Sequence, residues 1–356
     1  MASSNSALPK TMHAWTYTLA SPDLPAALTL NTSAPLPPNP PPKGHYLVQV
    51  LSSSINPIDY KIPELPLIPR LIITKPASPG CDFCGRIAAV PASSSSTEKT
   101  LEVGTPVFGR LDSPTQFGTC AAYTMAPFNG VVALPDGVAP DDAASAATTG
   151  LTAFQQIVPR VKPGARVFIN GGSGGVGCWG IQIAKAVGAK EVVVACSKGN
   201  FGLCESLGAD RCVDYRSEDV VEAVKKLAKE DGVFDLVVDN VGVPSQLYYQ
   251  SHQFLKEGVE FVQVGGGFGL GDIGALMSKM AWPRWFGGGR RKFLFLGVEN
   301  SNEDFERIGG WLKEGKCKAV IEEKVDAHEE GGPKKAFEML KTGRVKGKIV
   351  VNGWSE

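Results

Sequence analysis

One glycine-rich turn limits the choice of fold more than any other part of this sequence. The apolar run Arg166–Ile169 leads into Asn-Gly-Gly-Ser-Gly-Gly-Val-Gly, and a helix-like segment follows as far as Ala186. The glycines fit G-x-G-x-x-G between a predicted strand and a predicted helix, where they allow a tight turn, close backbone approach to a pyrophosphate, and close packing of the helix. The predicted cofactor-binding residues of this turn are Gly172, Gly174, Gly175, Val176 and Gly177.

The chain around this turn alternates between strand-like and helix-like segments. From about Pro140, helix-like stretches such as 141–158 and 217–229 alternate with short apolar runs at 191–195, 236–238 and 260–264. This alternation predicts an α/β fold with a doubly wound parallel sheet, the Rossmann arrangement. The stretch from about Met12 to Pro135 is instead rich in short strand-like runs separated by Pro, Gly and Ser.

The strand that follows the glycine turn indicates which dinucleotide is bound. Sites that prefer NAD carry an acidic residue about 20 residues further on, where it accepts a hydrogen bond from the ribose 2′-hydroxyl. This chain has Ser197 and Lys198 there and no carboxylate at the strand end. A hydroxyl and an ammonium favour a 2′-phosphate, so we expect NADPH as the cofactor.

The composition indicates the kind of partner and the compartment that suit this chain. The 356 residues are enough for two domains, and 36 basic residues balance 36 acidic ones, which gives no reason to expect nucleic acid as a partner. Neither a secretory leader nor a membrane-spanning apolar run is apparent in the sequence. The eight cysteines are mostly scattered, as in a protein of a reducing compartment. We therefore expect a cytoplasmic protein.

Several motifs together resemble one family. They are Asn56-Pro-Ile-Asp-Tyr-Lys61, Pro79-Gly-Cys-Asp-Phe-Cys-Gly85, Gly150-Leu-Thr-Ala-Phe154, the turn 170–177, Leu207-Gly-Ala-Asp210, Asp239-Asn-Val-Gly242 and Gly343-Arg-Val-Lys-Gly-Lys348. Their combination resembles the zinc-free, zeta-crystallin-like quinone oxidoreductases of the medium-chain dehydrogenase/reductase superfamily over about residues 12–352. The stretches 282–292 and 313–316 are closest to chloroplast-envelope quinone oxidoreductase homologues and their fungal relatives.

This resemblance implies an architecture and a set of site residues. A GroES-like, β-rich catalytic domain would comprise residues 1–138 and 299–356, with a Rossmann NADPH-binding domain at 139–298 between them. The family usually forms a homodimer through the edges of the Rossmann sheet. The implied cofactor-binding residues outside the glycine turn are Thr149, Ser197, Lys198, Tyr215, Asn240, Val264, Gly265 and Lys348, and those implied near the substrate carbonyl are Asn56 and Tyr60.

The places of the zinc ligands in metal-dependent members of the superfamily are filled differently here. Asn56 stands at the first place, Gly80-Cys-Asp82 replaces Gly-His-Glu, and Thr148 and Thr149 precede Gly150. A catalytic zinc needs three protein ligands, so we expect no metal. The pair Cys81 and Cys84 cannot complete a tetrahedral site alone; it is either structural or a redox-active pair.

Without a metal, an activated alkene or a quinone is the easiest hydride acceptor. We therefore expect an NADPH-dependent reductase of small electrophiles, meaning enones, enals or quinones. Asn56 or Tyr60 would donate to the oxygen on which charge develops, and the proton could come from Tyr60 or from water. Two alternatives stay open: a trans-acting enoyl reductase that partners a polyketide synthase, and a non-catalytic NADPH-binding protein.

The segment 265–292 departs from smaller family members. It contains Gly-Gly-Gly-Phe-Gly, and later two tryptophans beside Arg290-Arg-Lys292. One interpretation is a loop that covers the active site or supports the dimer. The other is a peripheral membrane contact through residues 277–292, since tryptophan beside basic residues suits a headgroup interface.

Overall fold

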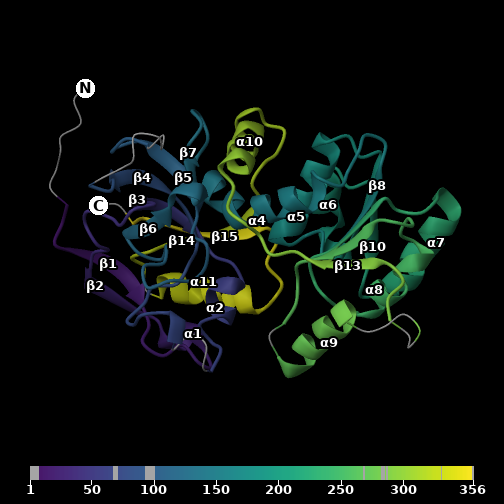
Figure 1. Ribbon diagram of the computed structural model, residues 1–356, viewed down its shortest axis with the longest axis horizontal. Helices are drawn as coiled ribbons and strands as arrows, with labels where there is room; N and C mark the ends of the chain where they lie inside the picture. Colours follow the sequence, from purple (N-terminus) through teal and green to yellow (C-terminus); the bar gives the residue numbers. More distant parts are fainter. Residues whose placement is uncertain are drawn as a thin grey trace. The chain divides into compact units, whose positions relative to one another are not determined.

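The structure is a computed structural model, and it describes residues 8–66, 71–92, 101–267, 269–281, 285, 288–329 and 331–354. The chain divides into two compact units, visible in Figure 1. The first unit combines Met1–Leu151 with Glu299–Glu356, and the second is Thr152–Val298. The first boundary therefore falls inside helix α4 (Pro140–Ile157).

The second unit is built on a parallel sheet of six described strands. They lie in the order β10-β9-β8-β11-β12-β13, and every neighbouring pair is parallel. In chain order this is 3-2-1-4-5-6, so the predicted doubly wound Rossmann sheet is confirmed. The strands are β8 (Arg166–Asn170), β9 (Glu191–Cys196), β10 (Arg211–Asp214), β11 (Leu236–Asp239), β12 (Glu260–Gln263) and β13 (Lys292–Phe295).

Crossover helices join these parallel strands, as parallel pairing requires. They are α5 (Gly175–Ala186), α6 (Phe201–Ser206), α7 (Val220–Asp231), α8 (Gln246–Tyr249) and α9 (Leu270–Ala281). Helix α7 shows why the chain turns helical at these places: the Asp219 side chain caps it by accepting from the backbone N–H groups of Val221 and Glu222. The central strands are apolar and buried, as strands covered on both faces must be.

The first unit is built on a mixed sheet to which both chain ends contribute: β14 and β15 pair in parallel, and the other neighbours pair antiparallel. Its order is β14-β15-β3-β4-β5-β7, with β6 also paired to β3, and β1 and β2 form a separate antiparallel pair. The strands are β1 (Thr11–Thr16), β2 (Thr29–Pro35), β3 (His45–Ser54), β4 (Asp82–Ala89), β5 (Pro106–Arg110), β6 (Tyr123–Pro127), β7 (Val131–Ala133), β14 (Ile321–Asp326) and β15 (Lys348–Asn352). The pairing of β15 with β3 places Lys348 beside the end of β3.

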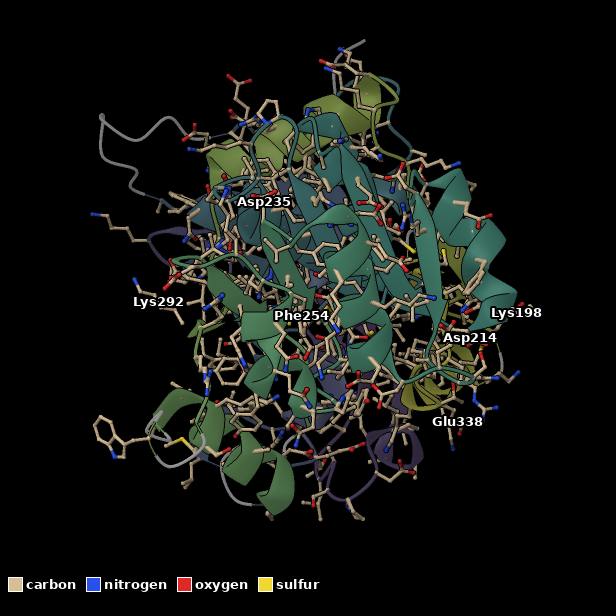
Figure 2. The ribbon with its side chains drawn as sticks, turned by 90° about the vertical axis from the view of Figure 1, so that its right-hand side faces the viewer. Lys198, Asp214, Asp235, Phe254, Lys292 and Glu338 are labelled. Atoms are coloured by element: carbon tan, nitrogen blue, oxygen red, sulfur yellow. The ribbon has the colours of Figure 1, made fainter. Side chains whose placement is uncertain are left out.

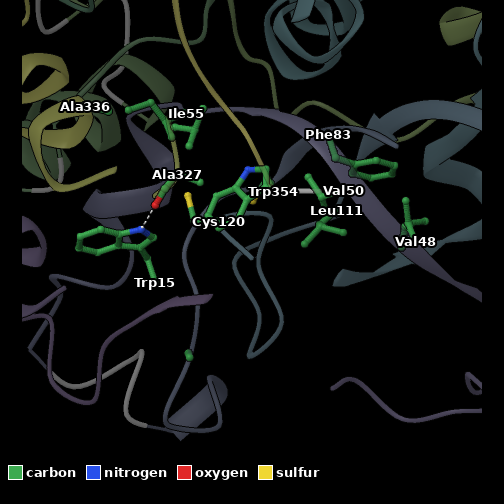
Figure 3. Close-up of a cluster of buried hydrophobic side chains, with 14 of the residues drawn as sticks. Trp15, Val48, Val50, Ile55, Phe83, Leu111, Cys120, Ala327, Ala336 and Trp354 are labelled. Carbon is green, nitrogen blue, oxygen red and sulfur yellow. Dashed lines mark hydrogen bonds between the residues drawn. The ribbon is translucent and has the colours of Figure 1, made fainter. Parts of the chain in front are cut away.

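Short helices complete the first unit: α1 (Leu24–Ala27), α2 (Ile58–Lys61), α10 (Asn302–Lys313) and α11 (Gly332–Lys341). Its main core joins N-terminal and C-terminal side chains, among them Trp15, Phe83 and Trp354 (Figure 3), and it also contains Phe337. The indole N–H of Trp15 donates to the carbonyl of Ala327 at 2.8 Å, which ties β1 to the C-terminal segment. None of the described helices is long and apolar enough to cross a membrane.

Candidate active site

Within the second unit, the predicted dinucleotide-binding residues lie at the switch point of the Rossmann sheet, where the strand order reverses between β8 and β11. Asn170 ends β8 and its Nδ2 donates to Asp239 Oδ1 at the end of β11, at 2.9 Å. The same carboxylate oxygen accepts from the backbone N–H groups of Val241 and Gly242 at 3.0 and 2.8 Å. Asp239 thereby joins the end of β8 to the loop that follows β11, and burial raises the pKa of its carboxyl.

The three glycines of the fingerprint do different work. A Cβ on Gly172 would lie 2.7 Å from the Val194 side chain, and one on Gly177 would lie 2.1 Å from the Gly171 carbonyl oxygen. The chain itself therefore demands glycine at these two positions. A Cβ on Gly174 would meet only the Gly171 oxygen, at 3.7 Å, so the space beside Gly174 is left open by the protein. That opening, at the start of α5, fits a pyrophosphate.

The residues predicted at the nicotinamide end also lie together. A Cβ on Gly265 would meet the Asn240 carbonyl oxygen at 2.1 Å, and the Val264 N–H donates to the Asp239 carbonyl at 3.0 Å. Asn240 Oδ1 accepts from Gln156 Nε2 at 3.0 Å, whereas its buried Nδ2 has no partner among the described residues. A buried amide donor without a partner is costly, so Asn240 suits a polar group of a bound nicotinamide.

The residues predicted to hold the 2′-phosphate directly follow β9 and β10 in the chain, and Lys198 lies close to Asp214 (Figure 2). Asp214 organises this corner by accepting from the Lys198 N–H at 3.3 Å, the Arg216 N–H at 3.1 Å and the Ser217 hydroxyl at 2.9 Å. These hydrogen bonds, with that from Arg216 the largest cause, lower the pKa of Asp214. The side chains of Lys198 and Tyr215 are exposed, and Ser197 is half-buried.

Arg216 is a basic residue of this corner that was not predicted from the sequence. Its guanidinium lies 5.9 Å from the centre of the Tyr215 ring. Asn200, two residues after Lys198, donates to the Ser173 hydroxyl of the glycine turn at 3.0 Å. The motif Tyr-Arg after β10 could have pointed to Arg216, because a second cation beside a phosphate site is the same signal that Lys198 gives.

Within the first unit, Asn56, which is predicted to lie near the substrate, belongs to a buried network with Asp82 and Lys348. Asn56 Nδ2 donates to Asp82 Oδ2 at 2.8 Å, and the Lys348 ammonium donates to Asn56 Oδ1 at 2.5 Å. Lys348 also donates to the Ile55 carbonyl at 2.8 Å and lies 3.5 Å from Asp82 Oδ2. The three side chains are nearly or wholly buried, with exposed fractions of 3%, 0% and 4%.

Asp82 also accepts hydrogen bonds from other neighbouring residues. Its Oδ2 accepts from the Ser54 hydroxyl at 3.0 Å, and its Oδ1 accepts from the Thr148 N–H and hydroxyl at 3.1 and 2.5 Å. Arg110 Nε donates in turn to the Thr148 hydroxyl at 3.1 Å. Thr149, predicted to contact the cofactor, is buried and its hydroxyl donates to the Ser145 carbonyl at 2.8 Å.

Tyr60 and Asp59 lie side by side on α2. Burial raises the pKa of the half-buried Tyr60, and Glu64 adds to that shift, so the phenol stays protonated at neutral pH. Asp59 is completely buried and accepts from the Asn56 N–H at 2.7 Å, which anchors the start of α2. Burial, with Asp82 as the second cause, raises the pKa of Asp59 to about 7.

The residues at the expected zinc place do not suit a zinc ion. The Asp82 carboxylate is already saturated by hydroxyl, amide and ammonium donors, and a lysine ammonium occupies its neighbourhood. Zinc prefers thiolate, imidazole or carboxylate ligands in a tetrahedral set. Across the described residues, no three His, Cys, Asp or Glu side chains are grouped so as to hold a metal.

The pair Cys81 and Cys84 shows no sign of reactivity. All eight cysteines are free thiols, and these two are buried. Burial raises the pKa of Cys81, and it raises that of Cys84 to about 12. Such thiols are poor nucleophiles and poor metal ligands. The C-x-x-C spacing therefore reflects packing around β4.

The segment 265–292, for which a loop is one of the two interpretations of the sequence, contains the helix α9. Lys279 of α9 is buried and its ammonium donates to the Gly242 carbonyl at 3.0 Å and to Gln263 Oε1 at 2.9 Å, which fastens α9 to the loops after β11 and β12. Met277 and Trp285 point to solvent, with exposed fractions of 56% and 82%. Residues 282–284, 286 and 287 of the predicted membrane contact lie outside the described residues.

Comparison with known proteins identifies the family of the chain. The family model described as "Alcohol dehydrogenase GroES-like domain" matches residues 42–136, and that described as "Zinc-binding dehydrogenase" matches residues 207–351. A trans-enoyl reductase of Aspergillus terreus is 46% identical over 97% of both chains. A zinc-type alcohol dehydrogenase-like protein of Schizosaccharomyces pombe is 35% identical over 88% of this chain and 89% of its own.

A solved structure extends the likeness to three dimensions. The quinone oxidoreductase from Coxiella burnetii superposes with a TM-score of 0.79 and 28% identity, covering 96% of this chain and 99% of its own. The predicted pairing of a GroES-like domain with a Rossmann domain is thereby confirmed. The chain belongs to the zinc-free, quinone-oxidoreductase-like family of the medium-chain dehydrogenase/reductase superfamily, together with fungal trans-enoyl reductases.

Proposed function

We propose that this chain transfers a hydride from NADPH to the activated C=C bond of an α,β-unsaturated carbonyl compound or to a quinone, without a metal ion. The observation that carries the proposal is the Asn56–Asp82–Lys348 network, in which the Asn56 amide stands at the place of the first zinc ligand and is hydrogen-bonded to the Lys348 ammonium and the Asp82 carboxylate. Hydrogen-bond donors of this kind can stabilise charge that is spread over an enolate or a hydroquinone oxygen. The names of the relatives, an enoyl reductase and a quinone oxidoreductase, support the same chemistry.

Several residues have separate roles in the proposed hydride transfer. The bound nicotinamide supplies the hydride. Asn56 donates through Nδ2 to the carbonyl or quinone oxygen and so lowers the cost of the charge that forms there. Tyr60, which stays protonated because burial raises its pKa, is the candidate proton donor to the α-carbon. The Gly172–Gly177 turn, with Asn240, Val264 and Gly265, orients the cofactor.

Preference for NADPH over NADH is proposed from the corner formed by β9 and β10. Ser197, Lys198 and Tyr215 would hold the 2′-phosphate, and Arg216 adds a second cation. A carboxylate beside them, that of Asp214, already accepts from three donors: the Lys198 N–H, the Arg216 N–H and the Ser217 hydroxyl. The ribose 2′-hydroxyl of NADH would therefore compete with these donors for the oxygens of the Asp214 carboxylate.

The identity of the acceptor has two leading candidates. Free enones and quinones suit a self-contained reductase, whereas an enoyl thioester on a carrier protein would suit a trans-acting enoyl reductase. The second candidate is favoured by one observation, the 46% identity to a trans-enoyl reductase over nearly the whole of both chains. A non-catalytic NADPH-binding role is the remaining alternative.

Oxidation of NADPH against a panel of acceptors tests these candidates. The panel contains a quinone, a 2-alkenal, a vinyl ketone, an enoyl thioester and a simple ketone, with NADH and a chelator as controls. We expect turnover of activated alkenes or quinones that the chelator leaves unchanged. Turnover of the thioester alone would select the carrier-linked role. Saturable NADPH binding with no turnover of any acceptor would contradict the enzymatic proposal.

We also propose a homodimer and a weak membrane contact, both through the second unit. Strand β13 is the edge of the parallel sheet, and its Phe295 is partly exposed, which suits edge-to-edge pairing with a second copy. Met277, Met280 and Trp285 expose large apolar side chains that suit a lipid headgroup interface. Sedimentation equilibrium tests the first proposal, and flotation with anionic vesicles tests the second.

A further inference from the structure

We propose that Lys348 is a positioning residue that acts through Asn56, holding its amide so that one Nδ2 hydrogen stays available to the oxygen of the substrate. The proposal rests on the proposed reduction of an activated carbonyl compound and assigns Lys348 a role other than the cofactor contact expected from the sequence. It is carried by the geometry of the buried network in the first unit.

The ammonium of Lys348 is committed within this unit. It donates to the Ile55 carbonyl at 2.8 Å and to Asn56 Oδ1 at 2.5 Å, and it lies 3.5 Å from Asp82 Oδ2. An ammonium group has three hydrogens, so these three acceptors account for all of them. With an exposed fraction of 4%, Lys348 has no hydrogen left for a phosphate of the cofactor.

These contacts fix which way the Asn56 amide points. An ammonium can only donate and a carboxylate can only accept, so Oδ1 must face Lys348 and Nδ2 must face Asp82. The backbone of Asn56 is held as well, because its N–H donates to Asp59 Oδ2 at 2.7 Å. Of the two Nδ2 hydrogens, one is used by Asp82, and the second is the hydrogen we assign to the substrate oxygen.

Asp82 does not need Lys348 as a hydrogen-bond donor. Its two oxygens accept from the Ser54 hydroxyl, from Asn56 Nδ2, and from both the N–H and the hydroxyl of Thr148. A buried cation costs desolvation free energy, and burial lowers the pKa of Lys348 while Asp82 opposes that shift. The shortest contact of this costly cation is to Asn56, which points to the amide as its target.

A cation on Oδ1 also strengthens the donor at the other end of the amide. Hydrogen bonds to charged groups polarise their neighbours, so the Nδ2 hydrogens become better donors. The benefit is largest when negative charge develops on the substrate oxygen, that is, in the transition state. Removing a whole oxyanion donor costs about 10²–10³ in kcat, so removing the group that holds it should cost roughly 10–100-fold.

The test compares Lys348→Met with Lys348→Met/Asp82→Asn and with Lys324→Met, a lysine-to-methionine control on the surface of the same unit. We expect Lys348→Met to lower kcat by roughly 10–100-fold while the Kd for NADPH, followed by its fluorescence, changes less than about twofold. The double variant removes the uncompensated carboxylate and should regain thermal stability but not kcat. The surface control should match the wild type in kcat.

Recovery of kcat in the double variant would mean that Lys348 only balances the charge of Asp82, and would overturn the proposal. A large rise in the Kd for NADPH would overturn it in favour of a cofactor contact. If Lys348→Met fails to fold, the same two readouts are taken on the double variant.

A readout that does not depend on turnover separates this proposal from the proposed function. The side-chain ¹⁵N–¹H₂ resonances of Asn56, identified by their loss in Asn56→Ser, should be displaced in the wild type and return toward ordinary values in Lys348→Met. Unchanged resonances would overturn the positioning role. Failure of the wild type on every acceptor, with the resonance shift present, would instead overturn only the proposed reduction.

Discussion

A matched pair of alanine substitutions in the glycine turn separates what the fold needs from what the cofactor needs. A Cβ at residue 177 would lie 2.1 Å from the Gly171 carbonyl oxygen and 2.7 Å from two backbone atoms of Gly172. A Cβ at residue 174 would meet only the Gly171 oxygen, at the ordinary distance of 3.7 Å. The two variants add the same methyl group in the same loop, so each serves as the control for the other.

Gly177→Ala should destabilise the second unit. Overpacking costs about 1–3 kcal/mol, and the upper end applies here because the overlapping atoms belong to the backbone and cannot rotate away. A loss of about 3 kcal/mol corresponds to a fall in Tm of roughly 6–12 °C for a unit of this size. Cofactor binding should be lost with it, because the turn and α5 must move apart.

Gly174→Ala should leave stability within about 1 kcal/mol of the wild type. Alanine restricts the unfolded chain, which favours folding, but it is a weaker N-cap than glycine, which opposes it. The backbone at this position, with φ −78° and ψ 173°, is open to alanine. The Kd for NADPH should nevertheless rise at least about tenfold, or 1.4 kcal/mol, because the methyl group fills the space left for the pyrophosphate.

Thermal unfolding and fluorescence titration with NADPH measure both variants. The reasoning is refuted if Gly177→Ala melts like the wild type, or if Gly174→Ala binds NADPH with unchanged affinity.

Three further predictions concern charged groups of the two units. In steady-state kinetics, Lys198→Glu should raise the KM for NADPH at least about tenfold and leave the KM for NADH nearly unchanged, because a carboxylate repels the 2′-phosphate that only NADPH carries. Equal effects on the two cofactors would show that Lys198 does not contact the 2′-phosphate. Burial raises the pKa of Asp59 from its ordinary value to about 7, so the folded state holds this proton more tightly than the unfolded state does. The free energy of unfolding should therefore fall by up to about 4 kcal/mol as the pH rises from 4 to 7. Urea titrations should show a flatter dependence on pH in Asp59→Asn, and an unaltered dependence would refute the assignment. Asp82→Ala should destabilise the first unit by about 3–5 kcal/mol, because Lys348 would be buried without its counter-ion. A variant as stable as the wild type in the same urea titrations would show that the Asp82–Lys348 ion pair does not stabilise the fold.

The Rossmann unit was largely predictable because its information is local. The strand at 166–169, the glycine turn and the following helix form one continuous stretch, and β8 with α5 lies where that stretch predicts it. The missed strand β10 shows the limit: Arg211-Cys-Val-Asp has one apolar pair between two charged ends, too short for a pattern to be recognised. Helix α9 was missed because the glycines on both sides of it are typical of a loop.

In the buried network of the first unit, individual residues could be predicted from the sequence, but the hydrogen bonds that join them could not. Asn56 and Lys348 were singled out through the resemblance, yet 292 residues separate them, and only the pairing of β15 with β3 brings them together. Asp82 was considered only as a poor replacement for a metal ligand, because a sequence does not show which donors surround a buried carboxylate. The same limit applies to Thr148, whose hydroxyl joins Asp82 to Arg110.

The most direct test of the central claim follows the hydride itself. The protein is incubated with NADPH deuterated at C4 of the nicotinamide and with an enone that it reduces, and the product is examined by NMR. Our account predicts deuterium on the β-carbon, a solvent-derived proton on the α-carbon, an intact carbonyl group, and the same rate with a chelator present. Deuterium on the carbonyl carbon of an alcohol product, or a rate abolished by the chelator, would contradict it.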